Sequence, residues 1–124
     1  MKTLTALVVG VFMLPTFAMA APVNCECVRY LREVHGINIR GDAVKHRPNL
    51  PFENLDVGDV LLMRIGKTAH DALIVGFEEQ VEWRGMIAPR YIWITDTNAV
   101  KPCTPSTRKI QIDDEDIVGI YRPL

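Results

Sequence analysis

Residues 24–32 constrain the fold more than any other part of the chain, because they combine a helix start, two cysteines and an amphipathic run. Asn24 is a residue type favoured at the N-cap of a helix, and Glu26 places an anion in the first turn. Gly36 can end the helix in the left-handed conformation that glycine adopts easily. The sequence therefore predicts a helix over residues 25–35.

The two cysteines of this helix are predicted to lie on different faces. At about 100° per residue, Cys27 shares its face with three apolar side chains, namely Tyr30, Leu31 and Val34. Cys25 lies largely on the other face. Only Cys27 is therefore expected to face the rest of the fold.

Cys27 is predicted to be a nucleophile. It lies near the helix start, where free backbone N–H groups and the helix dipole favour a thiolate over a thiol. The alternative is that Cys27 is a small hydrophobic side chain in the core, which is common for a cysteine on an apolar face. Its position, together with the histidine and carboxylate described below, favours the nucleophile.

The first 20 residues are predicted to be a secretory signal peptide. Lys2 precedes a long uncharged run, which ends in the small-residue pattern of a cleavage site at Ala18, Met19 and Ala20. A membrane anchor is the alternative, but the apolar core is shorter than the roughly 20 residues that cross a bilayer. We therefore expect a secreted or periplasmic protein, cleaved after Ala20, with no membrane span and one domain over residues 21–124.

Charge and cysteine number limit the partners of the chain. The formal net charge is −1 and no basic block is present, so nothing points to a nucleic-acid partner, and we expect a monomer. Three cysteines in an oxidising compartment leave one thiol free or bonded to another chain.

The predicted role of Cys27 bears on the disulfide pairing. If Cys27 must be free to act, Cys25 and Cys103 are left to bond with each other. The alternatives are a Cys25–Cys27 bond, which would distort the first helical turn, and a Cys27–Cys103 bond, which would silence the thiol.

The rest of the chain is predicted to contain four main strands, at residues 60–64, 69–77, 91–96 and 117–121. Residues 38–56 are interpreted as a long irregular connection, and His46 within it as a solvated loop histidine. The charged segment 78–89 and residues 101–108 are interpreted as connections. One helix ahead of several antiparallel strands predicts an α+β domain with the helix packed on the sheet.

Strand alternation separates the candidate catalytic residues. His70 shares a strand face with small and apolar residues, whereas Asp71 points to the other face. If strands 69–77 and 91–96 pair antiparallel, His70 and Asp96 can be cross-strand partners. Asn98, on the same face as Asp96, could assist or replace it. The alternative for both residues is turn chemistry at the end of a strand.

Five motifs, in the order in which they occur, resemble one family. They are C-V-R-Y-L-R from Cys27, G-D-V from Gly58, H-D-A-L-I-V from His70, D-T-N from Asp96 and V-G-I-Y-R-P from Val118. The chain resembles the CHAP domain, a family of cysteine- and histidine-dependent amidohydrolases and peptidases within the papain-like and NlpC-type cysteine hydrolases. The match covers nearly all of the chain after the predicted signal peptide.

The resemblance implies a papain-like fold and a cysteine hydrolase that acts on peptidoglycan in the cell wall. Cys27 corresponds to the nucleophile, His70 to the general base, and Asp96 or Asn98 to the group that orients the histidine. Backbone N–H groups at the helix start would stabilise the oxyanion. The cut would fall within a peptide (endopeptidase) or between muramic acid and the stem peptide (N-acetylmuramoyl-L-alanine amidase), with no metal or cofactor.

Two other classes of function remain open. The chain could be a secreted binding or inhibitor protein that has lost catalysis. It could also hold zinc, since Cys27, His70 and Asp96 are residue types that bind this metal. No C-x-x-C pair or histidine doublet supports zinc, and the two thiols of the C-x-C motif are predicted to lie apart.

Overall fold

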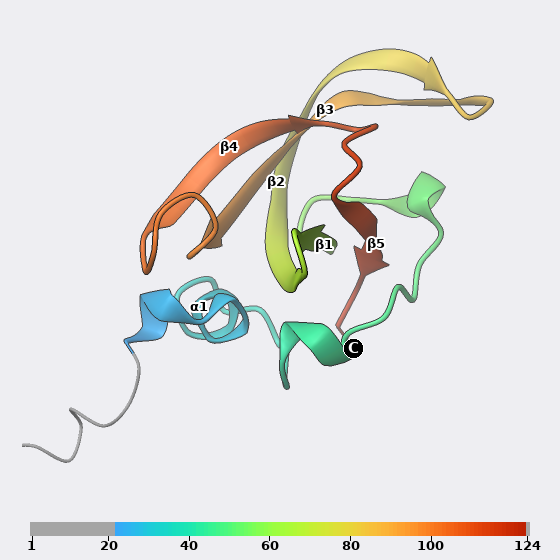
Figure 1. Ribbon diagram of the computed structural model, residues 1–124. Coiled ribbons are helices and arrows are strands. Elements are labelled where there is room, and N and C mark those ends of the chain that lie inside the picture. The colour runs from blue at the N-terminus through green and yellow to red at the C-terminus, as the bar shows by residue number, and fades with distance from the viewer. Residues whose placement is uncertain (1–21, 124) are drawn as a thin grey trace, which may run out of the picture.

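The computed structural model describes residues 22–123, so the predicted signal peptide, residues 1–20, lies outside the described part. A five-stranded antiparallel sheet with the strand order β4-β3-β2-β1-β5 dominates the fold (Figure 1). Its strands are β1 (Val60–Ile65), β2 (Thr68–Trp83), β3 (Met86–Thr97), β4 (Pro105–Gln111) and β5 (Ile117–Tyr121). No helix in residues 22–123 is both long enough and apolar enough to cross a membrane.

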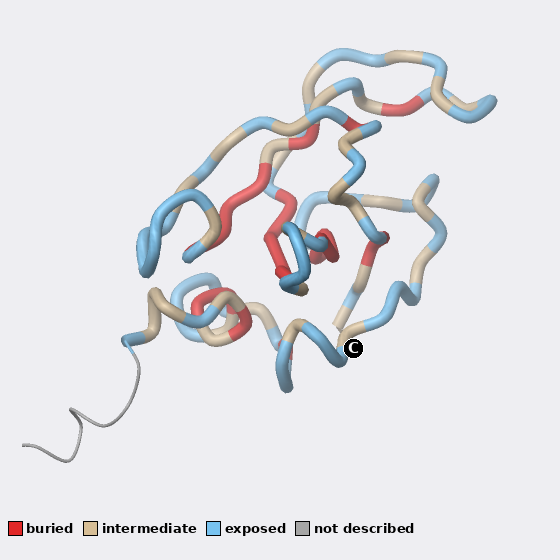
Figure 2. Tube along the Cα trace, viewed as in Figure 1, coloured by how far each residue is buried: buried red, intermediate tan, exposed pale blue. Residues whose placement is uncertain are grey.

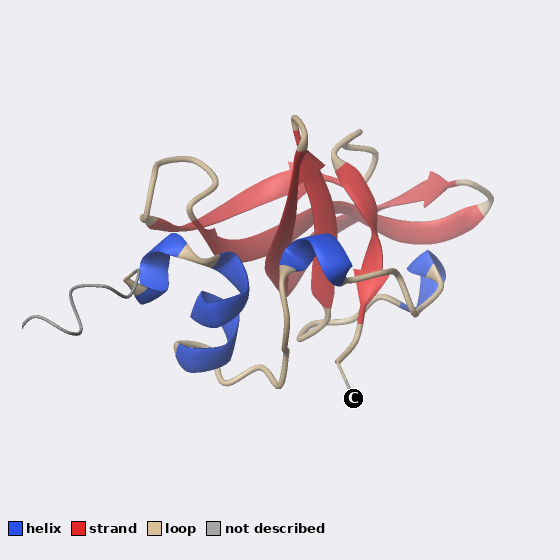
Figure 3. Ribbon diagram, turned by 60° about the horizontal axis from the view of Figure 1, so that its bottom comes forward, coloured by secondary structure: helices blue, strands red, loops and turns tan. Residues whose placement is uncertain are grey.

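Within residues 22–123, one α-helix and three short 3-10 turns accompany the sheet. They are α1 (Cys27–Glu33), η2 (Val23–Cys25), η3 (Ala43–Lys45) and η4 (Phe52–Asn54). Both α1 and η3 lie on the same side of the sheet in two views (Figures 1 and 3). This arrangement places the start of α1 and the chain that follows it next to the central strands.

The helix is shorter than predicted. Residues 23–25 form η2 instead of the first turn of an α-helix, and Glu26, with an extended backbone, occupies the N-cap. The predicted cap, Asn24, therefore lies outside α1. The buried face of α1 carries Val28, Tyr30 and Leu31, whereas Val34 is 52% exposed, contrary to the prediction.

The expectation of an α+β, papain-like domain with a helix packed on an antiparallel sheet was wrong, because the chain is mostly β. The helix has only 7 residues, whereas β2 has 16 and β3 has 12. These two strands continue through residues 78–89, which the sequence pattern had indicated as a connection. Their hairpin closes at Arg84 and Gly85, whose φ values of 51° and 79° are typical of a type I′ turn.

Strand β1 is buried on both faces over most of its length, as its apolar side chains indicate. Leu61 and Met63 belong to one hydrophobic cluster, and Val60 and Leu62 belong to a second. The second cluster also contains the buried side chains of α1 and Ile39. Figure 2 shows the buried residues gathered on the central strands and on one side of α1.

Candidate active site

A histidine and a carboxylate meet between β2 and β3. The Nε2 atom of His70 lies 2.8 Å from Oδ2 of Asp96, and both side chains are buried. Thr95 faces Leu73 across the two strands, so continuing this register places Asp96 on the face of His70. The predicted contact between His70 and Asp96 is confirmed. In this register Asp96 lies opposite Ala72, so it reaches His70 diagonally, two residues along β2.

Two residues of β4 hold the other oxygen of Asp96. Oδ1 accepts hydrogen bonds from Ser106 Oγ at 2.9 Å and from Arg108 Nη1 at 2.6 Å. Burial opposes ionisation of Asp96, but the hydrogen bonds from His70 and Arg108 and their charges outweigh it and lower the pKa of Asp96. The carboxylate is therefore held ionised and fully bonded.

Sequence reasoning missed Ser106 and Arg108 because residues 101–108 were interpreted as a loop. In the structure Ser106 pairs with Asp96, and Arg108 pairs with Ile94. The available signal was period-two alternation, since Ser106, Arg108 and Ile110 share one side of a strand that begins at Pro105.

Cys27 is the first residue of α1 and carries a free, half-buried thiol. Burial on its own would lower the pKa of His70, but hydrogen bonding to Asp96 and Cys27 and the charges of both raise it from 6.5 to about 9. With Nε2 facing Asp96, Nδ1 is the ring nitrogen left to exchange a proton with the thiol. The structure thus brings three of the predicted site residues, Cys27, His70 and Asp96, together.

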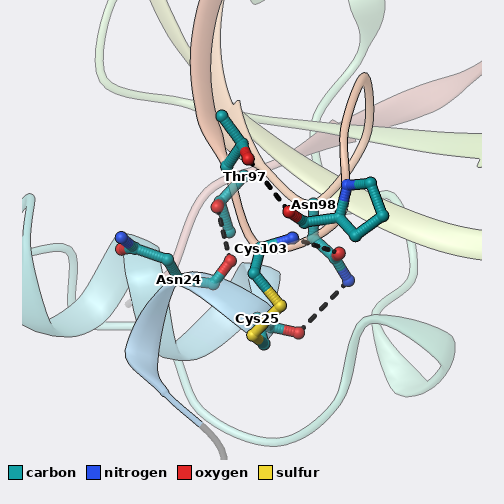
Figure 4. The surroundings of a disulfide bond; sticks show 7 residues. Asn24, Cys25, Thr97, Asn98 and Cys103 are labelled. Atoms are coloured by element: carbon teal, nitrogen blue, oxygen red, sulfur yellow. Dashed lines mark hydrogen bonds between the residues drawn. A yellow bond between two sulfur atoms is a disulfide. The ribbon is translucent and has the colours of Figure 1, made fainter.

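The structure contains the predicted disulfide between Cys25 and Cys103 (Figure 4). Next to it, Thr97 Oγ1 donates a hydrogen bond of 2.6 Å to the carbonyl oxygen of Asn24. These two links attach η2, the segment that leads into Cys27, to the end of β3 that carries Asp96. Cys25 is bonded and Cys27 is free, but the two cysteines do not lie on two faces of one helix as predicted, because Cys25 belongs to η2 and α1 begins at Cys27.

The side-chain hydrogen bonds of Asn98 go to Cys25 and Cys103 rather than to His70. Its Nδ2 donates to the carbonyl oxygen of Cys25 at 3.2 Å, and its Oδ1 accepts from the N–H of Cys103 at 2.8 Å (Figure 4). Its φ of 63° takes the chain out of β3 into the loop. The amide therefore braces the disulfide and leaves the orientation of His70 to Asp96.

The interpretation of His46 as a solvated loop histidine was wrong. Its side chain is only 6% exposed, and its Nδ1 lies 2.5 Å from Oδ2 of the buried Asp71. Strand alternation was correct in pointing Asp71 away from His70. β2 thus contributes to two His–Asp pairs, His70–Asp96 and His46–Asp71, from adjacent residues.

A cavity of about 430 Å³ opens beside Cys27. One part of its lining comes from the start of α1 and the residue before it: Glu26, Cys27, Val28, Arg29 and Arg32. The other part comes from Gly41, Asp42 and Ala43. Cys27 alone among the three converging residues lines this cavity, so it is the residue at which a molecule in the cavity meets the His70–Asp96 pair.

Within residues 22–123, no group of three or more histidine, cysteine, aspartate or glutamate side chains could hold a metal ion. The chain was also compared with family models, curated proteins and solved structures, and none of them matched it.

Proposed function

We propose that the chain is a secreted cysteine hydrolase that cleaves amide bonds, with Cys27 as nucleophile, His70 as acid and base, and Asp96 as the orienting group. One observation carries the proposal: a free thiol and a buried carboxylate act on the same imidazole. A histidine whose pKa is raised by a specific thiol and carboxylate beside a cavity is typical of a catalytic site.

The raised pKa of His70 defines the resting state of this mechanism. With a pKa of about 9, the imidazole is protonated at neutral pH. In the proposed mechanism Cys27 reacts as the thiolate, which the positive charge of the neighbouring His70 stabilises. The imidazolium also keeps its hydrogen bond to the ionised Asp96.

The reaction then follows two steps. The Cys27 thiolate attacks the amide carbonyl, and His70 gives its proton to the leaving amine as the C–N bond breaks, which leaves a thioester. His70, now neutral, takes a proton from water, and the hydroxide attacks the thioester to release the carboxylic acid and the thiolate. Asp96 keeps the ring in place throughout.

The proposed substrate is peptidoglycan, cut either within a peptide or between muramic acid and the stem peptide. The motifs around Cys27, His70 and Asp96 support this proposal through their resemblance to the CHAP domain, and the predicted signal peptide would bring the protein to the cell wall. The mostly β fold does not support the resemblance to the CHAP domain, so the proposed substrate depends on the sequence motifs alone.

Digestion of purified peptidoglycan, followed by mass spectrometry of the products, tests the proposal. New N-termini within peptides would identify an endopeptidase, and free stem peptides beginning with L-Ala would identify an amidase. Cys27→Ser should lower the rate by at least about 100-fold, because a hydroxyl cannot form the ion pair with His70.

The matched control is chemical modification of the same thiol. Iodoacetamide should alkylate Cys27 in the wild type, and alkylation should abolish digestion. Turnover that survives Cys27→Ser would refute the nucleophile. A Cys27 that resists alkylation, together with intact peptidoglycan, would favour the inactive binding or inhibitor protein.

A further inference from the structure

The segment from Arg40 to His46 touches both the cavity beside Cys27 and strand β2. Gly41, Asp42 and Ala43 form the part of the cavity lining that does not come from the α1 region. His46, three residues later, reaches Asp71 on β2. The wall of the cavity and the second His–Asp pair therefore belong to one short piece of chain.

His46 closes this piece of chain into a loop. Its Nε2 lies 2.5 Å from the carbonyl oxygen of Arg40, so the ring of the last residue bonds to the backbone of the first. Its Nδ1 lies 2.5 Å from Oδ2 of Asp71, which ties the closed loop to the sheet. All three wall residues, Gly41 to Ala43, lie between these two ends.

Packing immobilises the same imidazole. The ring stacks on Tyr121 of β5, with centroids 4.9 Å apart and planes 10° from parallel. The side chains of His46 and Asp71 are 6% and 1% exposed. A buried ring held by two hydrogen bonds and a stacking partner has little freedom, so the loop that it closes is held as well.

The two bonds of His46 require a defined number of protons. A carbonyl oxygen and an ionised carboxylate only accept hydrogen bonds, so both ring nitrogens must donate, or Asp71 must carry one of the protons. Burial raises the pKa of Asp71 against the opposing effect of His46. In either arrangement His46 and Asp71 share two protons. One is used in the hydrogen bond between His46 and Asp71, and the other in the bond to the carbonyl oxygen of Arg40.

The His46–Asp71 pair is separate from the catalytic pair. His70 and Asp71 are adjacent on β2 and point to opposite faces, and His70 bonds to Asp96 rather than to Asp71. Loss of His46 would therefore release the cavity wall while leaving Cys27, His70 and Asp96 in contact.

We propose that His46 is a positioning residue for the substrate, which holds residues 41–43 as the wall of the cavity beside Cys27. The inference rests on the proposed function, because the cavity is taken as the place where the substrate lies next to the thiol. His46 sets how tightly the substrate is bound, and it takes no part in the proton transfers.

The test compares His46→Ala with His35→Ala as a matched control. His35 also makes a side-chain hydrogen bond, at 3.1 Å to Tyr30 Oη, and an aromatic contact, but it lies outside the 40–46 loop that contributes Gly41, Asp42 and Ala43 to the cavity. With peptidoglycan fragments, His46→Ala should raise KM about tenfold and leave kcat within about twofold of the wild type. His35→Ala should leave both unchanged.

Hydrogen exchange and alkylation provide readouts that need no substrate. The Lys45 N–H donates to the carbonyl oxygen of Asp42 inside the loop, and its protection should fall at least tenfold in His46→Ala. Alkylation of Cys27 by iodoacetamide should keep the wild-type rate, because the small reagent does not need the wall.

Each outcome decides between the two proposals. An unchanged KM and unchanged Lys45 protection would overturn the role of His46 while leaving the hydrolase intact. A fall in kcat with slower alkylation would also overturn it, since His46 would then act on the catalytic pair. If the wild type shows no turnover, the proposed hydrolase is refuted. Hydrogen exchange at the Lys45 N–H would still show whether His46 holds residues 41–43 in place. If His46→Ala does not fold, His46→Gln replaces it, because its amide donates to only one of the two acceptors.

Discussion

Both carboxylate oxygens of Asp96 accept hydrogen bonds, and this fixes the orientation of the His70 ring. Oδ2 faces His70, whereas Oδ1 accepts from Ser106 and Arg108. The carboxylate therefore cannot turn without losing a bond to a buried partner, which costs more than an ordinary hydrogen bond contributes. The orientation of the imidazole follows from residues that lie on three different strands.

Asp96→Asn should lower kcat/KM by about 100-fold or more, which is the range of a positioned acid–base group. An amide has a single oxygen, so its nitrogen would face either His70 or Arg108, and both of these are donors. Initial rates on peptidoglycan fragments, with the fold checked by circular dichroism, measure the loss.

Asn98→Ala is the control for this variant. Its amide bonds to Cys25 and Cys103, so its removal should lower the free energy of unfolding by about 1 kcal/mol and change kcat/KM by less than about threefold. A loss of activity as large as that of Asp96→Asn would contradict the assignment of the orienting role to Asp96.

The pKa of His70 also predicts how stability depends on pH. The folded-state pKa of about 9 lies above the value of 6.5 for an unfolded histidine. The stabilisation is therefore fully present below about pH 6.5 and is lost as the pH rises through about 9. The shift corresponds to a contribution of up to about 3 kcal/mol.

Urea unfolding at pH 6 and pH 9.5 measures this contribution, with His70→Gln as the control. The free energy of unfolding of the wild type should fall between the two pH values by more than that of His70→Gln. An equal fall in both proteins would show that His70 is not the group responsible.

At the scale of elements, the site depends on the way in which η2, α1 and β3 are linked. The Cys25–Cys103 disulfide and the bond from Thr97 to Asn24 attach the approach to α1 to the end of β3. Cys27 follows this anchor by two residues. A seven-residue helix is marginal by itself, so its position depends on these links and on its buried face.

Replacing Cys25 and Cys103 together by serine should lower the free energy of unfolding by about 4 kcal/mol in the chain-entropy estimate. The bond closes a loop with a sequence separation of 78 residues, so its removal frees most of the described chain in the unfolded state. Urea unfolding of the double variant against the wild type gives the difference.

Peptide mapping without reduction accompanies this measurement and should find Cys27 unbonded in active protein. A stable disulfide at Cys27 in active protein would contradict both the pairing and the mechanism. A double variant as stable as the wild type would show that the bond does not hold η2 against β3.

At the scale of the whole molecule, the mostly β sheet serves as the frame for both His–Asp pairs. β2 lies in the middle of the strand order, next to β1 on one side and β3 on the other. His70 and Asp71 therefore find partners from opposite faces of one strand, Asp96 on β3 and His46 in the connection after α1. The central position of β2 explains why all four side chains are buried.

Sequence by itself determined the features that follow from local rules. Alternation along a strand separated His70 from Asp71, and antiparallel pairing brought His70 to Asp96. Each of these inferences needs only the geometry of one element or of one pair of neighbours. The odd number of cysteines, together with the predicted role of Cys27, indicated the bond between Cys25 and Cys103.

Tertiary structure alone decided the fold class and the partners that are distant in the chain. Residues 78–89 and 105–108 were interpreted as connections, but they form strands because β3 pairs with β2 on one side and with β4 on the other. The sequence around His46 predicts a solvated histidine, because its partner Asp71 lies 25 residues away in the chain. Whether a polar segment forms a strand, or a polar side chain is buried, depends on the free energy of burying it against distant parts of the chain. A local sequence pattern contains no information on those distant parts.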